Sequence, residues 1–95
     1  MLFAQRIKTA RLENGLLQRQ LAMVLNIDVP MYSRIEHGSR QAKREQVLIL
    51  SDILNIEQEE LLTLWMIDKI TKVIGKDNDI AGKALKKITD DKIWR

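Results

Sequence analysis

Apolar side chains recur at helical spacing along nearly the whole chain, and no stretch shows the alternation typical of a strand. This spacing predicts helices over residues 2–13, 18–25, 29–37, 43–54, 58–74 and 79–92. Glycine or asparagine follows each of the first five stretches, as is typical of helix ends. The pattern therefore predicts an all-α fold.

Residues 18–38 predict two short helices joined by a tight turn. Ala22 is small enough for the two helices to cross closely, and Asn26 tolerates the left-handed backbone of a tight turn. Asp28 can cap the second helix, and Pro30 fits the first turn of a helix, where its missing amide proton is not needed. We therefore expect two helices that share a buried seam at a steep angle.

The helix expected over residues 58–74 is rich in apolar side chains, which make up nine of the 14 residues from 61 to 74. This is wider than the stripe that a surface helix needs, so the helix must be covered on more than one side, within the chain or by a second chain. The last helix has an apolar face formed by Ala81, Ala84, Leu85 and Ile88. It can fold back on the preceding helix or exchange with a second chain, and Trp94 is either a loose terminus or an anchor in that contact.

Composition excludes several kinds of site. The 95 residues include no cysteine and one histidine, His37, so neither a disulfide framework nor a thiolate metal site can form. No apolar run has membrane-spanning length and no signal-peptide pattern is present, so we expect a cytoplasmic protein without membrane contact. No nucleophile–base pair, metal cluster or phosphate-binding loop is found, so we expect neither an enzyme nor a bound cofactor.

The basic excess lies in the first part of the chain. Residues 1–55 carry eight basic and five acidic side chains, whereas residues 56–95 carry eight of each, so the first segment accounts for the whole net charge of +3. Between positions 34 and 44 the basic residues Arg34, Arg40, Lys43 and Arg44 stand against Glu36 alone. Such a cluster is typical of a surface that contacts a phosphate backbone.

Over residues 6–64 the chain resembles the helix-turn-helix domain of the phage repressor and Cro-like (XRE) family. The matching residues are Arg6-Ile7, Arg11-Leu12, Asn14-Gly15-Leu16, Gln18, Leu21-Ala22, Leu25, Ile27, Ser33-Arg34-Ile35-Glu36, Gly38 and the apolar helix from about Val47 to Leu54. The chain departs from the family at Leu17, where a capping serine or threonine is usual. The resemblance implies a five-helix repressor-like domain, here with an extended fifth helix and an additional C-terminal helix.

The resemblance also implies that the second helix of the motif enters the DNA major groove. The residues that it places at DNA are Gln18, Val29, Pro30, Met31, Ser33, Arg34, His37, Arg40, Lys43 and Arg44. We expect Arg34 to contact a base, guanine in the first instance, or else a phosphate. Val29, Pro30 and Met31 depart from the polar residues common in the family. They would read thymine methyl groups or DNA shape, or contact a protein instead.

Two domains are expected: a helix-turn-helix DNA-binding domain over residues 1–64 and a C-terminal helical extension for dimerisation over residues 65–95. The expected dimer contacts are Leu62, Trp65, Met66, Ile70, Val73, Leu85 and Ile88. The expected function is a sequence-specific transcriptional regulator, in the first instance a repressor, that binds an inverted repeat in double-stranded DNA as a homodimer. The alternative is a protein-interaction module with the same fold, such as an antitoxin that binds a toxin or a protein that contacts the transcription machinery.

Overall fold

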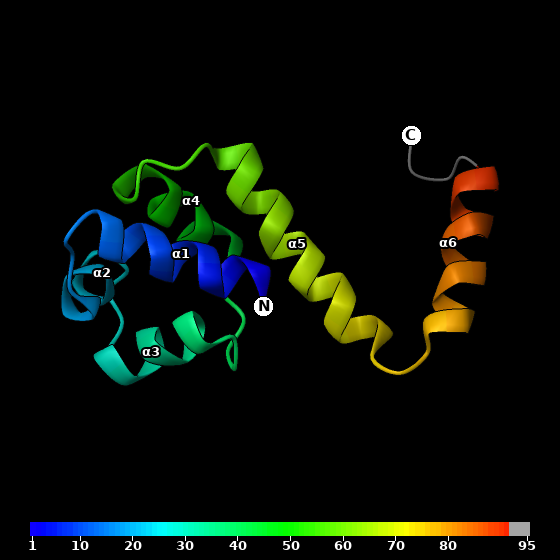
Figure 1. Ribbon diagram of the computed structural model, residues 1–95, viewed down its shortest axis with the longest axis horizontal. Coiled ribbons are helices and arrows are strands. Elements are labelled where there is room, and N and C mark those ends of the chain that lie inside the picture. The colour runs from blue at the N-terminus through cyan, green and yellow to red at the C-terminus, as the bar shows by residue number, and fades with distance from the viewer. Residues whose placement is uncertain (92–95) are drawn as a thin grey trace.

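The computed structural model describes residues 1–91, which form six α-helices and no strand (Figure 1). The helices are α1 (Leu2–Glu13), α2 (Gln18–Val24), α3 (Val29–His37), α4 (Arg44–Ile53), α5 (Gln58–Ile74) and α6 (Asn78–Asp91). The all-α fold is confirmed, and each helix begins and ends within one residue of its predicted range. Trp94, which was considered as an anchor for a second chain, lies outside the described residues.

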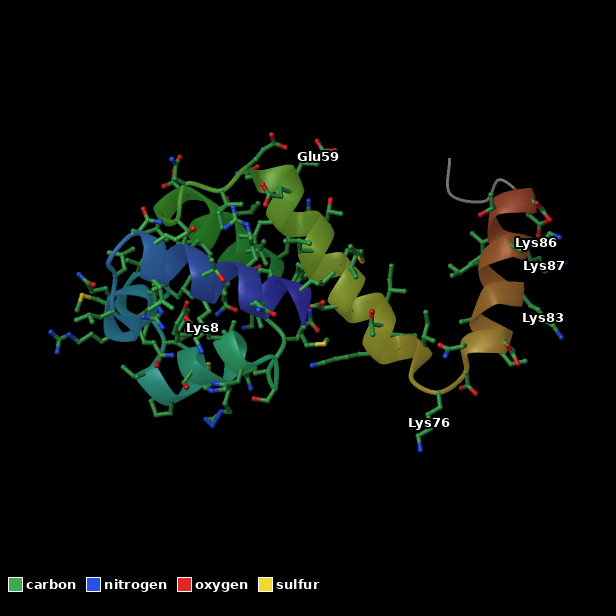
Figure 2. All side chains as sticks on the ribbon, in the orientation of Figure 1. Lys8, Glu59, Lys76, Lys83, Lys86 and Lys87 are labelled. Atoms are coloured by element: carbon green, nitrogen blue, oxygen red, sulfur yellow. The ribbon has the colours of Figure 1, made fainter. Side chains whose placement is uncertain are left out.

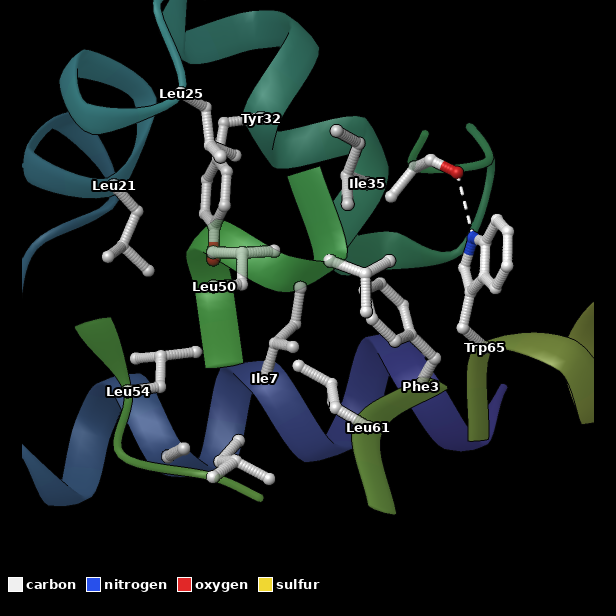
Figure 3. Close-up of a cluster of buried hydrophobic side chains, with 14 of the residues drawn as sticks. Phe3, Ile7, Leu21, Leu25, Tyr32, Ile35, Leu50, Leu54, Leu61 and Trp65 are labelled. Carbon is white, nitrogen blue, oxygen red and sulfur yellow. Dashed lines mark hydrogen bonds between the residues drawn. The ribbon is translucent and has the colours of Figure 1, made fainter. Parts of the chain in front are cut away.

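Helices α1 to α5 enclose one hydrophobic core, because the apolar residues of each helix turn to the same interior (Figure 3). The largest fully buried side chains are Tyr32, Ile7, Leu21, Ile35, Leu50, Leu61 and Val47. Within this core α1 packs against α3 and α5, α2 against α3, and α4 against α5. The two helices of the motif are therefore held against a scaffold made by α1, α4 and α5.

Residues 58–68 of α5 contribute to this core and hold two other segments in place. Trp65 is buried, and its indole N–H donates a hydrogen bond to the carbonyl oxygen of Ala42 at 2.8 Å (Figure 3). The carboxylate of Asp68 accepts hydrogen bonds from the backbone N–H groups of Leu2 at 3.0 Å and Phe3 at 2.9 Å. These amides belong to the first turn of α1, which has no cap from its own N-cap side chain. Thus α5 supplies the cap that α1 lacks.

Two of the residues expected at a dimer contact lie in or against the core instead. Trp65 is 5 % exposed, and Leu62 is half-buried where it packs against the core. By contrast, Met66, Ile70 and Val73 are exposed, with Val73 the most open at 87 %. The apolar stripe of α5 is therefore covered within the chain only along its first half.

The rest of α5 and the whole of α6 project from the core and form an open V (Figure 1). Gly75 ends α5 with a positive φ of 55°, which favours glycine, and three residues separate α5 from α6. No residue of α6 is buried. We call residues 66–91 the C-terminal arm; it gives the molecule its longest dimension of 44 Å.

None of the helices in residues 1–91 combines the length and the apolar character needed to cross a membrane.

Candidate nucleic-acid interface

Helices α2 and α3 cross through a turn whose geometry is set by local hydrogen bonds. Asn26 has a φ of 56°, and the N–H of Ile27 donates to the carbonyl of Ala22 at 3.0 Å, which closes the end of α2. The carboxylate of Asp28 accepts a hydrogen bond from the N–H of Met31 at 2.8 Å and so caps α3. The turn and cap expected from the sequence are therefore present in the structure, and they fix where α3 begins.

The start of α2 is stabilised without a capping side chain at Leu17. The carboxamide oxygen of Gln20 accepts a hydrogen bond from the backbone N–H of Leu17 at 2.7 Å. This bond is one of the two in a capping box. It requires an acceptor side chain at the third helical residue and none at the N-cap itself. Leu17 itself is 49 % exposed, so packing contributes little at this position.

Helix α3 turns one side to solvent and the other to the core. We call the solvent side the reading face; its residues are Val29, Pro30, Ser33, Arg34 and His37. Their spacing places them along a single helical stripe; Ser33 is half-buried within it, and half-buried Met31 lies at its edge. Tyr32, Ile35 and Glu36 are buried on the opposite side. The sequence-predicted residues of α3 therefore share one accessible surface.

A buried ion pair lies beneath α3. The guanidinium of Arg11 donates to both carboxylate oxygens of Glu36, from Nη2 at 2.9 Å and from Nε at 3.0 and 3.2 Å. The two side chains are only 10 % and 1 % exposed. The third nitrogen, Nη1 of Arg11, donates to the carbonyl of Leu16 at 3.0 Å, and the carboxamide N–H of Gln18 donates to Glu36 at 3.3 Å. We call these residues the polar junction; it connects α1, α2 and α3.

Burial and pairing act in opposite directions on the ionisation of this junction. Burial alone would raise the pKa of Glu36, but hydrogen bonds led by those from Arg11 lower it below its ordinary value. Those same bonds raise the pKa of Arg11. Burial raises the pKa of the Tyr32 hydroxyl strongly, and the charge of Glu36 adds to that effect. The pair is therefore ionised at neutral pH, and the tyrosine is neutral.

The polar junction corrects the expected placement of two residues. The charge of Arg11 predicts it on the outward face of α1, with Arg6 and Lys8, but Arg11 is buried because it pairs with Glu36 beneath α3. The sequence also allows Glu36 to pair with Arg34 on a solvated surface; instead, the oxygens of Glu36 accept from Arg11 and Gln18. Gln18, predicted at the DNA, is half-buried and tied to α3 through Glu36.

Exposed polar groups follow one another from the end of α3 to the start of α4. His37 Nδ1 lies 2.7 Å from the Ser33 carbonyl, a geometry in which the ring nitrogen donates and Nε2 is left for an outside partner. Beyond α3, the side chains of Arg40, Lys43 and Arg44 are all exposed. Lys43 is the N-cap residue of α4, and Arg44 is its first residue. Cations therefore lie beside the positive end of a helix dipole, where an anion is favoured.

One exposed cation beside Gln18 is not among the residues expected at DNA. Arg19 follows Gln18 in the first turn of α2 and is exposed. Its only signal was its place next to a residue already assigned to the DNA side. With respect to metals, no three histidine, aspartate or glutamate side chains within residues 1–91 lie together as a metal site would require.

Comparison with known proteins agrees with this geometry. A family model described as helix-turn-helix matches residues 7–61, which is more than half of the chain and includes α2, α3 and the polar junction. No curated protein and no solved structure matches the chain. The chain therefore belongs to the helix-turn-helix family of phage repressor and Cro-like (XRE) DNA-binding regulators.

Proposed function

We propose that this regulator is sequence-specific, that it acts as a repressor, and that it binds an inverted repeat as a homodimer. The observation that best supports this proposal is the reading face of α3. It is accessible along one stripe, and the polar junction and core hold the opposite side of the helix. A helix held in this way is already ordered, so it can enter a major groove without a further loss of conformational entropy.

Sequence reading falls to the exposed half of α3. In this proposal the guanidinium of Arg34 donates two hydrogen bonds to O6 and N7 of a guanine, and the Ser33 hydroxyl donates to or accepts from a neighbouring base. Val29, Pro30 and Met31 offer only apolar surface, which fits the methyl group of thymine. We therefore expect an operator half-site that combines a guanine with one or more thymines.

Phosphate binding falls to the groups that flank α3. Arg40, Lys43 and Arg44 follow it, while Gln18 and Arg19 stand at the start of α2. Contacts of this kind set the register of the protein on the duplex and carry no sequence information themselves. They also make the affinity depend on salt, because each neutralised phosphate releases counterions.

A dimer extends this recognition to a longer site. Two copies of α3 related by a twofold axis would meet half-sites about 34 Å apart, which is one turn of DNA. The matching operator is an inverted repeat, because a twofold protein reads the same bases on both strands. Repression would follow when such a site overlaps a promoter, since bound protein blocks access to it.

A selection from a random duplex pool at two salt concentrations tests this proposal. We expect recovery of an inverted repeat, and a log–log slope of affinity against salt of about −0.9 for each neutralised phosphate. Scrambling the recovered site while keeping its composition should reduce affinity at either salt concentration. Recovery of no common sequence, or of a single half-site without symmetry, would contradict specific recognition by a twofold dimer.

A second candidate function rests on the apolar start of α3. Val29 is 42 % exposed, and it adjoins Pro30 and Met31 without a polar side chain among them. Such a surface could bind a protein, as an antitoxin binds a toxin. The two functions respond differently to salt: DNA affinity falls steeply as salt rises, whereas an apolar protein contact is nearly unaffected.

A further inference from the structure

The C-terminal arm contains an apolar groove between its two helices. The groove has a volume of about 520 Å³ and is lined by Met66, Lys69, Ile70, Val73, Ile74, Asp77, Ile80, Ala81, Ala84 and Leu85. Only two of these ten residues, Lys69 and Asp77, are charged. Few charges and many large aliphatic side chains are typical of the centre of a protein interface.

Helix α6 has little support within its own chain. None of its 14 residues is buried, and Ile80 and Leu85 are 63 % and 50 % exposed. Its interior also contains Gly82, which weakens a helix relative to alanine. An isolated helix of this length is marginal in water. Helix α6 therefore needs an apolar partner that the single chain does not supply.

The helix is nevertheless built with two distinct faces (Figure 2). Lys83, Lys86 and Lys87 lie on the side of α6 turned away from α5. The side toward the groove carries Ile80, Ala84 and Leu85. The apolar face of α6 is therefore a wall of the groove, and it is also the kind of surface that would fill such a groove.

The connection between α5 and α6 sets the opening of the groove in this structure. It is only three residues long, from Gly75 to Asp77. The N–H of Asp77 donates to the carbonyl of Ile74 at 2.9 Å, and the carbonyl of Asp77 accepts from the N–H of Ala81 at 2.8 Å. These bonds link the connection to the helix on either side and set the angle at which α6 leaves α5.

We propose that the groove of each copy receives α6 of a second copy, so that two C-terminal arms interlock as a four-helix dimer. This inference rests on the proposed homodimer and names the segment that forms it. An exchange of this kind is self-complementary. The apolar face of each α6 lines the groove of its own copy and also packs into the groove of the other copy. The arm leaves seven large apolar side chains exposed, and their burial in both copies would form the apolar centre that an interface needs. They are Met66, Ile67, Ile70, Val73, Ile80, Leu85 and Ile88.

Cysteine cross-linking tests the exchange directly, since the chain contains no native cysteine. Val73→Cys and Leu85→Cys are purified separately, one with a longer tag, then mixed without DNA and mildly oxidised. We expect a disulfide-linked dimer of mixed mass, because α5 of one copy meets α6 of the other. In the matched control, Lys87→Cys on the outer face of α6 replaces Leu85→Cys, and the mixed dimer should be at least tenfold less abundant.

A double variant with both Val73→Cys and Leu85→Cys in one chain separates exchange from closure. Interlocked arms give disulfides between chains, whereas α6 closing on its own α5 gives an oxidised monomer. Oxidation that yields only the monomer would overturn the proposal.

A second measurement does not depend on disulfide geometry. Leu85→Lys should raise the dimer dissociation constant about a hundredfold in sedimentation, because the lost apolar contact occurs twice in a twofold interface. Lys87→Ala should leave the dissociation constant within about twofold. A dimer insensitive to Leu85→Lys, or a monomer at every concentration, would overturn the exchange. Both measurements omit DNA, so a dimer that fails to bind DNA would count against the proposed function alone.

Discussion

The Arg11–Glu36 pair lies at the point where three helices meet, so single atoms there affect the whole motif. The carboxylate of Glu36, in α3, accepts hydrogen bonds from Arg11 of α1 and Gln18 of α2. Loss of one partner would leave an uncompensated buried charge, which is usually costlier than the pair is stabilising. The position of the reading face therefore depends on a residue that we do not expect to touch DNA.

Glu36→Gln should lower the free energy of unfolding by about 3 kcal/mol at pH 7, since it leaves the Arg11 charge buried without its counter-charge. The folded-state pKa of Glu36 lies below its ordinary value of about 4.5, so its stabilising effect is complete above that pH and is lost as pH falls through the lower, folded-state value. Urea unfolding at several pH values should show this acid loss in the wild type and a smaller one in Glu36→Gln.

The exposed Glu45→Gln is the matched control and should change stability by less than about 0.5 kcal/mol. An equal acid dependence in the wild type and in Glu36→Gln would show that other carboxylates carry the effect.

Arg34→Ala should weaken binding to the selected operator by about 1–3 kcal/mol and relax the preference at one base pair of each half-site. The reason is that a bidentate contact discriminates among bases, whereas its loss leaves the phosphate contacts in place. Titrations on the operator and on its single-base variants measure this. Lys43→Ala is the comparison, because a phosphate contact should weaken all sequences alike and reduce the salt slope by about one. A uniform loss for Arg34→Ala would reassign Arg34 to a phosphate.

At the scale of single residues, the sequence could predict the reading face but not the polar junction. Asp28 and Asn26 act on their immediate neighbours, so their roles follow from local spacing. Arg11 and Glu36 lie 25 positions apart, and each taken alone resembles an ordinary surface charge. Only the fold brings them together. The charge of Arg11 favours the solvent side of α1, although its spacing from Phe3 and Ile7 places it on the buried stripe.

Among the elements, α5 has two roles along one continuous helix. Its first half packs in the core through Leu61 and Trp65, and its second half leaves the core and exposes Ile70 and Val73. The sequence predicted the length of this helix because Gly75 ends it, and also its apolar excess. The sequence could not predict which residues of α5 are buried by the rest of the chain. That burial depends on where α1 and the connector before α4 lie.

Asp68→Ala should lower the free energy of unfolding by about 2 kcal/mol, because the N–H groups of Leu2 and Phe3 lose their acceptor. For a domain of this size that corresponds to a fall in Tm of about 10 °C, measurable by circular dichroism. Asp68→Asn keeps one acceptor oxygen and should cost less. Asp52→Ala, an exposed aspartate of α4, should have almost no effect; an equal loss there would remove the special role of Asp68.

Across the whole molecule, charge and shape divide between two regions. Residues 1–55 carry the whole basic excess, and the C-terminal arm carries the apolar groove between α5 and α6. The excess could be counted from the sequence, and the structure leaves its cluster Arg34, Arg40, Lys43 and Arg44 exposed. The open groove of the arm was not predictable from spacing, since it results from the angle at Gly75 and its neighbours.

The hydrogen bonds of Asp68 also determine what could be transplanted from this protein. They join the first turn of α1 to α5 across sequence separations of 66 and 65 residues. The N-terminal end of the domain is thereby held against its C-terminal end. The stretch that the family model matches, residues 7–61, contains neither the carboxylate nor the two amides that it holds. A fragment limited to that stretch would contain the reading face but not the hydrogen bonds of Asp68 to Leu2 and Phe3. The smallest fragment that keeps both extends from residue 1 to at least Asp68.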